Sequence, residues 1–178
     1  MAVKKMSVKG MVYAVLFGAL TAAGAFIVIP LPPVPITAQT FFLNICAVLL
    51  GGSLGALSQF IYLMLGIVGL PVFAGGKAGI GVIFGPTGGY LLGFIIAAFV
   101  TGEIARAKKG AGIFWYILSM FCGMLIIYCV GSLWLAQTAK ITFHRALVIG
   151  VLPFIPGDII KILLAAIIAV RVKDRIKV

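Results

Sequence analysis

Acidic residues are scarce in this sequence: Asp and Glu together number 3 of 178 residues, against 14 Lys and Arg. Charged residues of both signs make up only 10% of the chain, whereas hydrophobic residues make up 63%. Soluble domains are about half apolar and about a quarter charged, so this composition excludes the soluble class. The few charges cluster between long neutral stretches, which is the pattern of a chain that crosses a lipid bilayer several times.

Cysteine and histidine are sparse as well. Cys46, Cys122 and Cys129 lack the spacing of metal ligands, and His144 is the one histidine. We therefore expect no metal site, and cysteines that act as small buried hydrophobes. Residues 51–55 (GGSLG) match the nucleophile elbow of hydrolases, but His144 is expected at the opposite membrane surface. Because no base lies beside that serine, the sequence predicts that the protein is not an enzyme.

The sequence lacks a nucleotide site and a nucleic-acid site. Gly76 and Lys77 resemble the end of a phosphate-binding loop, but Pro71 stands where its first glycine belongs and Ala78 where Ser or Thr belongs. The net charge of +11 does not form a basic stripe among polar residues. Most basic residues flank apolar runs, where anionic headgroups and membrane topology account for them. We expect the lipid bilayer, and no nucleic acid, as the partner of these charges.

Six apolar stretches follow one another along the chain: residues 11–30, 37–50, 54–70, 86–105, 112–134 and 146–170. The second and third come from one uncharged segment, residues 36–70. As a single helix that segment would measure roughly 50 Å, well beyond a hydrocarbon core of ~30 Å. The glycines at 51 and 52 therefore predict a turn between two short spans.

The distribution of basic residues tests this division into six spans. Ten of them then share the side of both termini, namely Lys4, Lys5, Lys9, Arg106, Lys108, Lys109, Arg171, Lys173, Arg175 and Lys177. Lys77, Lys140 and Arg145 lie on the other side, and Lys161 lies within the last span. Because basic residues are enriched in cytoplasmic segments, this split predicts an all-α, multi-pass protein of the cell membrane with both termini cytoplasmic. No linker separates the spans, so residues 1–178 are expected to form one transmembrane domain.

Two opposite charges lie at membrane depth in the last span. Asp158 and Lys161 are three residues apart, on one face of the predicted helix, and Pro153 and Pro156 interrupt that helix just before them. An unpaired charge at this depth costs about 2.5–3.5 kcal/mol even on lenient insertion scales, and irregular backbone there is tolerated where it lines a cavity. The pair is either a structural ion pair or part of a binding site, and we favour the binding site.

Further residues suited to a binding site gather on the same side of the membrane: Gln39 and Asn44 in the second span, Thr87 and Tyr90 at the start of the fourth, and Gly75 and Gly76 in a glycine-rich segment before it. Each polar residue alone indicates a packing hydrogen bond, but together they form one convergence of polar groups. The glycine-rich segment is predicted to be a lid over a ligand rather than an ordinary flexible loop. The inner halves of the spans lack polar residues, which excludes a channel.

The first span carries small residues at helical spacing: Ala14, Gly18 and Ala22, with Ala19 and Ala23 beside them. Small residues let two helices approach closely. This face is predicted either to pack within the bundle or to dock on another protein, and the spacing leaves both open.

Four segments resemble a known family: residues 35–40 (PITAQT), 69–76 (GLPVFAGG), 85–94 (GPTGGYLLGF) and 156–161 (PGDIIK). In this order, over nearly the whole chain, they resemble the BioY family, the biotin-specific S components of energy-coupling-factor (ECF) transporters. The resemblance implies a six-helix bundle that captures biotin from outside as its transported ligand, with no cofactor. It also implies a module of two ATPase subunits and a transmembrane coupling subunit, on which the small-residue face of the first span would dock.

The chemistry of biotin agrees with the resemblance. Its ureido ring offers N–H donors and a carbonyl acceptor, which the Asp158 carboxylate and the Lys161 ammonium complement. Its thioether ring needs apolar walls, which Phe73 and Tyr90 could supply.

The carboxylate of biotin favours a basic outer mouth, here carrying Lys77, Lys140 and Arg145. Lys77 departs from the more purely glycine-rich loop of the family. Two rival functions stay open: an autonomous ion-coupled carrier with Asp158 as its proton relay, and an intramembrane enzyme, for which no nucleophile and base share one side.

Overall fold

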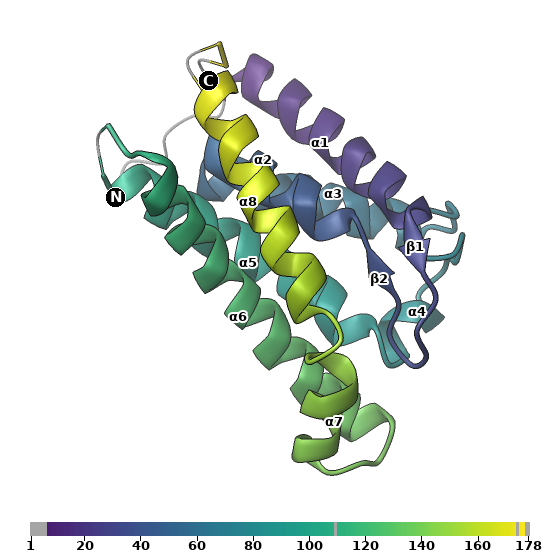
Figure 1. The fold of residues 1–178 in the computed structure, drawn as a ribbon. Coiled ribbons are helices and arrows are strands. Elements are labelled where there is room, and N and C mark those ends of the chain that lie inside the picture. The colour runs from purple at the N-terminus through teal and green to yellow at the C-terminus, as the bar shows by residue number, and fades with distance from the viewer. Residues whose placement is uncertain (1–6, 109, 174, 177–178) are drawn as a thin grey trace, which may run out of the picture.

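A computed structural model describes residues 7–108, 110–173 and 175–176. Within them the chain is all-α apart from one short ribbon of two strands (Figure 1). In chain order the elements are α1 (Val8–Phe26), β1 (Val28–Ile29), β2 (Ile36–Thr37), α2 (Gln39–Leu50), α3 (Gly52–Ile67), α4 (Gly81–Phe84), α5 (Gly88–Ala107), α6 (Ile113–Thr138), α7 (Phe143–Gly150) and α8 (Ile155–Val172).

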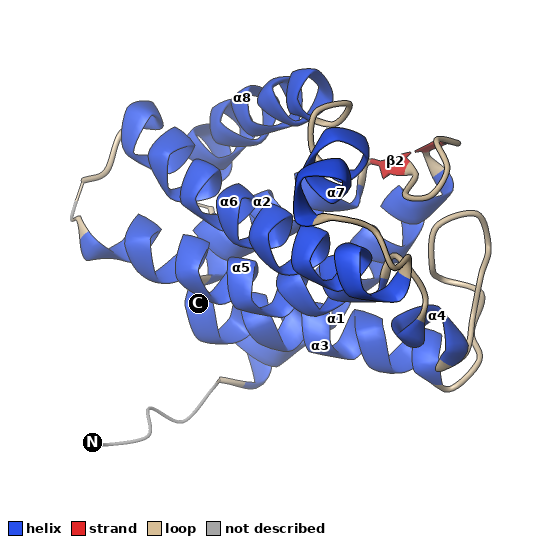
Figure 2. Ribbon diagram, turned by 90° about the horizontal axis from the view of Figure 1, so that it is seen from below, coloured by secondary structure: helices blue, strands red, loops and turns tan. Residues whose placement is uncertain are grey.

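The helices run between two ends of a bundle that differ in their backbone. The strands, α4 and α7 lie together at one end, which we call the ribbon end (Figures 1 and 2). At the opposite end α1 begins, α8 finishes and the turn between α2 and α3 lies, so we call it the Gly51 end. Between the two ends α5 packs against α6, α3 and α2, whereas α8 packs against α2 and α6.

Several of these helices are long and apolar enough to cross a membrane. α1, α5 and α6 meet that requirement singly, and α7 and α8 meet it together as one span bent by 56°. α2 and α3 are apolar but shorter, as expected for two helices made from one uncharged segment. By length and composition, the described residues therefore contain three spans, or four with the bent pair.

The predicted glycine turn between the second and third spans is confirmed. Gly51 adopts φ 78°, a left-handed conformation that favours glycine, and it separates α2 from α3. A Cβ atom added at Gly51 would lie 2.1 Å from the Arg106 side chain. That side chain is fixed because its Nη2 donates to the Leu50 carbonyl at 2.5 Å, which satisfies a free carbonyl at the end of α2.

The sequence left open whether the small-residue face of α1 packs within the bundle or docks on another protein, and the structure divides its residues between a buried and an exposed side. Ala14, Gly18 and Ala22 are buried, and a Cβ atom added at Gly18 would lie 3.1 Å from the Ser58 carbonyl oxygen of α3. These three residues therefore pack within the bundle, which corrects their assignment to partner docking. Ala19 and Ala23 lie on the exposed side of α1.

The backbone at the ribbon end is irregular in two places. β1 and β2 pair antiparallel, with Val28 opposite Thr37, and carry the chain from α1 to α2. Residues 151–154 separate α7 from α8, and Pro156 occupies the first turn of α8. The interruption that the prolines predicted is thus confirmed, and it turns the start of α8 toward the bundle interior, where Asp158 is buried.

Candidate functional site

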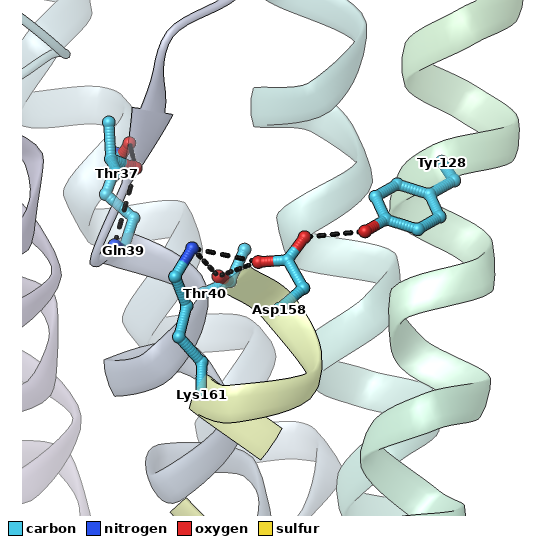
Figure 3. A network of polar contacts seen from close by, with 6 residues as sticks. All are labelled: Thr37, Gln39, Thr40, Tyr128, Asp158 and Lys161. Carbon is cyan, nitrogen blue, oxygen red and sulfur yellow. Dashed lines mark hydrogen bonds and ion pairs between the residues drawn. The ribbon is translucent and has the colours of Figure 1, made fainter. Parts of the chain in front are cut away.

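Asp158 is the centre of a polar network that joins three helices (Figure 3). Its Oδ1 accepts hydrogen bonds from Lys161 Nζ at 2.8 Å and from Thr40 Oγ1 at 3.3 Å. Its Oδ2 accepts one from the Tyr128 hydroxyl at 2.6 Å. Lys161 Nζ also donates to Thr40 Oγ1 at 3.4 Å. Because Thr40 belongs to α2, Tyr128 to α6 and the charged pair to α8, the network exists only where these helices meet.

The break before α8 explains why a carboxylate is stable at this place. Asp158 lies in the first turn of the helix, where the free backbone N–H groups favour a negative charge. Lys161 follows three residues later on the same face and neutralises it. The two side chains are 7% and 17% exposed, so the pair is largely removed from solvent.

The network leaves some hydrogen-bonding capacity unused. A carboxylate has about four lone-pair sites, and an ammonium has three N–H donors. Among the described residues Asp158 accepts three hydrogen bonds and Lys161 donates two. One acceptor site on Asp158 and one N–H of Lys161 therefore remain for a ligand. Such a ligand needs a donor and an acceptor side by side.

Gln39 holds a second polar contact beside this network. Its Oε1 accepts a hydrogen bond from Thr37 Oγ1 at 2.7 Å, and its Nε2 donates to the Tyr62 hydroxyl. Tyr62 in turn meets Phe73 edge to face, with ring centroids 5.7 Å apart. These contacts connect the ribbon, α2 and α3 to the loop that follows α3, and they position Gln39 and Phe73 on one wall.

The cavity at the ribbon end brings these groups together. Its polar lining consists of Thr37, Gln39, Thr40, Lys77, Thr87, Tyr90, Tyr128, Asp158 and Lys161. Its apolar lining consists of Val34, Pro35, Phe73, Ala74, Val82, Leu91, Phe94, Ile127 and Phe154. The lining thus converges from the ribbon, from the loops that follow α3, α4 and α7, and from helices α2, α4, α5, α6 and α8.

Tyr90 contributes its ring rather than its hydroxyl. The hydroxyl donates to the Gly150 carbonyl at 2.8 Å, which ties α5 to the end of α7. A Cβ atom added at Gly131 of α6 would lie 2.3 Å from the Tyr90 ring, so the ring packs directly on that glycine. Its position is therefore fixed before any ligand enters.

Seven of the ten residues predicted for ligand binding line the cavity: Gln39, Phe73, Lys77, Thr87, Tyr90, Asp158 and Lys161. Asn44, Gly75 and Gly76 are not part of its lining. Asn44 lies one turn beyond Thr40 on α2, toward the Gly51 end, and is 2% exposed. Gly75 and Gly76 form the exposed tip of their loop, and no atom lies within 4 Å of a Cβ atom added there.

Sequence reasoning missed Thr40 and Tyr128. Both contact the Asp158 carboxylate, yet they are 118 and 30 residues from it along the chain. A tyrosine in the middle of a long apolar span is the one signal that pointed to Tyr128. For Thr40, the position next to Gln39 was the available signal. Of the three basic residues predicted to lie on the outer side, Lys140 and Arg145 are not part of the cavity lining.

Known proteins resemble this chain over almost its whole length. A family model described as "BioY family" matches residues 1–178. The "Probable biotin transporter BioY" of Pyrococcus horikoshii is 45% identical over 168 residues, which cover 94% of this chain and 98% of the relative. The "Biotin transporter BioY" of Thermotoga maritima is 45% identical over 158 residues, which cover 89% of this chain and 92% of the relative.

The fold also resembles a solved structure, the S-component for biotin from an ECF-type ABC transporter. The TM-score is 0.85 at 30% sequence identity, and the match covers 94% of this chain and 92% of that one.

Proposed function

This chain belongs to the BioY family, and we propose that it is the biotin-binding S component of an ECF transporter. In this role it captures biotin at the outer face of the cell membrane and delivers it inward together with an ATP-driven module. It is a multi-pass membrane protein. The observation that supports this proposal most directly is that Asp158 keeps an unused acceptor site and Lys161 an unused N–H.

The ureido ring of biotin fits these two groups. Each N–H of the ring stands beside the carbonyl, so one edge presents a donor and an acceptor together. In our proposal Asp158 accepts from the N–H and Lys161 donates to the carbonyl oxygen. Hydrogen bonds to charged groups contribute about 1.5–3 kcal/mol each, more than neutral ones, and the Tyr128 and Thr40 contacts hold the carboxylate ready for this edge.

Aromatic side chains form the walls for the thioether ring and the aliphatic tail. Phe73, Tyr90, Phe94 and Phe154 are all buried and all line the cavity. Their positions are set by contacts within the protein, such as the edge-to-face contact of Phe73 with Tyr62. A preformed apolar pocket with a few convergent polar groups is the usual form of a small-molecule site.

The proposed topology has six spans and both termini in the cytoplasm, with the ribbon end outside. α2 and α3 then form a hairpin of two short spans whose turn is cytoplasmic. The ten-to-three distribution of basic residues supports this orientation. In a cysteine-free background, a single cysteine at position 77 or 140 should react with an impermeant thiol reagent in intact cells, and one at position 108 should not. Labelling at position 108 alone would reverse the orientation.

We further propose that α1 docks on a transmembrane coupling subunit, which connects the chain to two ATPase subunits. The sequence has no phosphate-binding loop, so ATP hydrolysis requires other subunits. Ala19 and Ala23 place small side chains on the exposed side of α1, next to Val12 and Val15, which are 64% and 52% exposed. Small residues at such a face allow close approach of a partner helix in the membrane.

The experiment that tests this function uses the purified chain in liposomes. We expect saturable biotin binding by the chain alone, without ATP-stimulated accumulation. Accumulation should begin when the coupling subunit and both ATPases are reconstituted with it. A folded chain that binds no biotin contradicts the proposal. Biotin uptake driven by a proton gradient in the chain alone would instead identify an autonomous ion-coupled carrier.

A further inference from the structure

Lys77 lines the cavity but takes no part in the Asp158 network. It lies in the loop between α3 and α4, and its side chain is exposed at the mouth. Among the described residues, its Nζ has no ion-pair or hydrogen-bond partner. Lys77 is therefore a cation at the cavity whose charge is available to a ligand.

The backbone around Lys77 is held firmly on α3. The Phe73 N–H donates to the Lys77 carbonyl at 3.0 Å, so the two residues close a small hairpin. Phe73 is 1% exposed, and its ring packs so closely on Gly66 that a Cβ atom added there would lie 2.1 Å away. Two residues after Lys77, the Gly79 N–H donates to the Gly66 carbonyl at 2.7 Å. Lys77 thus lies between two attachments to the same glycine.

The charges of the cavity do not balance. Asp158 and Lys161 neutralise each other at 2.8 Å, and Lys77 is the remaining charged residue in the described lining. The lining therefore carries a net charge of +1. A ligand with a neutral polar head and one negative charge restores neutrality, with the head at the largely buried pair and the negative charge at the exposed Lys77.

We propose that Lys77 binds the carboxylate of the ligand tail and makes the site selective for ligands whose carboxylate is not modified. This inference rests on the assignment of biotin and deepens it. The ureido ring at Asp158 and Lys161 leaves the flexible tail directed toward the mouth, where the Lys77 ammonium attracts its carboxylate. Of the three outer cations, Lys77 alone lines the cavity, so Lys140 and Arg145 take no part in this contact.

The test compares biotin with biotinol, in which a neutral alcohol replaces the carboxylate. Both are titrated by calorimetry against the purified wild type, Lys77→Gln and the matched control Arg145→Gln, which removes an outer cation that does not line the cavity. Because Lys77 is exposed, solvent weakens its ion pair, and we expect a two- to fivefold effect, which is about 0.4 to 1 kcal/mol.

The wild type should bind biotin about two- to fivefold more tightly than biotinol. Lys77→Gln should lose that preference while biotinol affinity stays the same, Lys77→Arg should restore part of it, and Arg145→Gln should behave like the wild type. Equal losses for both ligands in Lys77→Gln, or no loss for either, would show that Lys77 does not recognise the carboxylate. A wild type that binds neither ligand overturns the biotin assignment itself, whereas an altered preference tests only Lys77.

Discussion

The two ends of the bundle use polar residues in opposite ways. At the ribbon end, Thr40, Tyr128, Asp158 and Lys161 bond to one another and still retain free donors and acceptors at a cavity. Nearer the Gly51 end, the Thr101 hydroxyl is buried without a partner among the described residues and is not part of the lining of that cavity.

The two ends also differ in how regular their backbone is, because regular helices pack directly on one another near the Gly51 end. Near the Gly51 end, a Cβ atom added at Gly102 of α5 would lie 2.2 Å from the Gly52 backbone nitrogen of α3. At the ribbon end, the chain leaves regular helix in the ribbon, in the loop after α3 and between α7 and α8. In a membrane protein such irregular backbone is stable where it lines a cavity, so the broken elements and the cavity occur together.

The largest expected effect comes from a matched pair of glycine substitutions. Gly102→Ala puts a methyl group into backbone at the Gly51 end, so we expect destabilisation of about 1–3 kcal/mol or more and a clear fall in melting temperature. Gly157→Ala, in the first turn of α8, meets no atom within 4 Å and should be neutral or slightly stabilising. Thermal unfolding in detergent measures both. Equal melting temperatures would mean that position 102 tolerates an added methyl group as well as position 157 does.

The next effect concerns the charged pair itself. Asp158→Asn keeps the side-chain shape but replaces an acceptor by a group with a donor, so biotin affinity should fall about ten- to a hundredfold. Lys161→Ala should also weaken binding. Isothermal titration measures both, with Glu103→Gln at the Gly51 end as the acidic control that should bind like the wild type.

The double variant Asp158→Leu with Lys161→Met separates a site from a scaffold. A buried ion pair can often be replaced by apolar residues without loss of stability. If this variant folds and binds biotin like the wild type, the pair is structural, and the proposed site is wrong.

The smallest expected effect comes from a Thr→Val substitution made separately at each end of the bundle. Thr40→Val removes a hydroxyl that contacts both Asp158 and Lys161, so biotin affinity should fall a few-fold, about 1 kcal/mol. Thr101→Val removes a buried hydroxyl without a partner and should leave affinity unchanged and stability equal or higher. Biotin titration and melting curves of the two variants decide this. Weaker binding in Thr101→Val would extend the functional region to the Gly51 end.

Local patterns in the sequence were sufficient to predict several features of this protein. The turn at Gly51 and the interruption before α8 follow from glycine and proline chemistry within a few residues. The prediction that Asp158 and Lys161 belong to a binding site follows from the cost of charge at membrane depth, which holds for any packing of the helices. Their pairing is likewise local, because residues three apart share one face of a helix.

Only the tertiary structure decided which residues from other helices reach that pair. Thr40 and Tyr128 meet Asp158 because α2 and α6 pack on α8 at one particular rotation and height, and apolar spans carry little signal for either. The rotation of α1 was likewise decided by packing, which buries Ala14, Gly18 and Ala22 and leaves Ala19 and Ala23 exposed. Hydrophobicity and charge determine that a segment crosses the membrane, because they concern the segment and the lipid alone. The rotation of each helix depends on close contacts with its neighbours, and these exist only in the folded bundle.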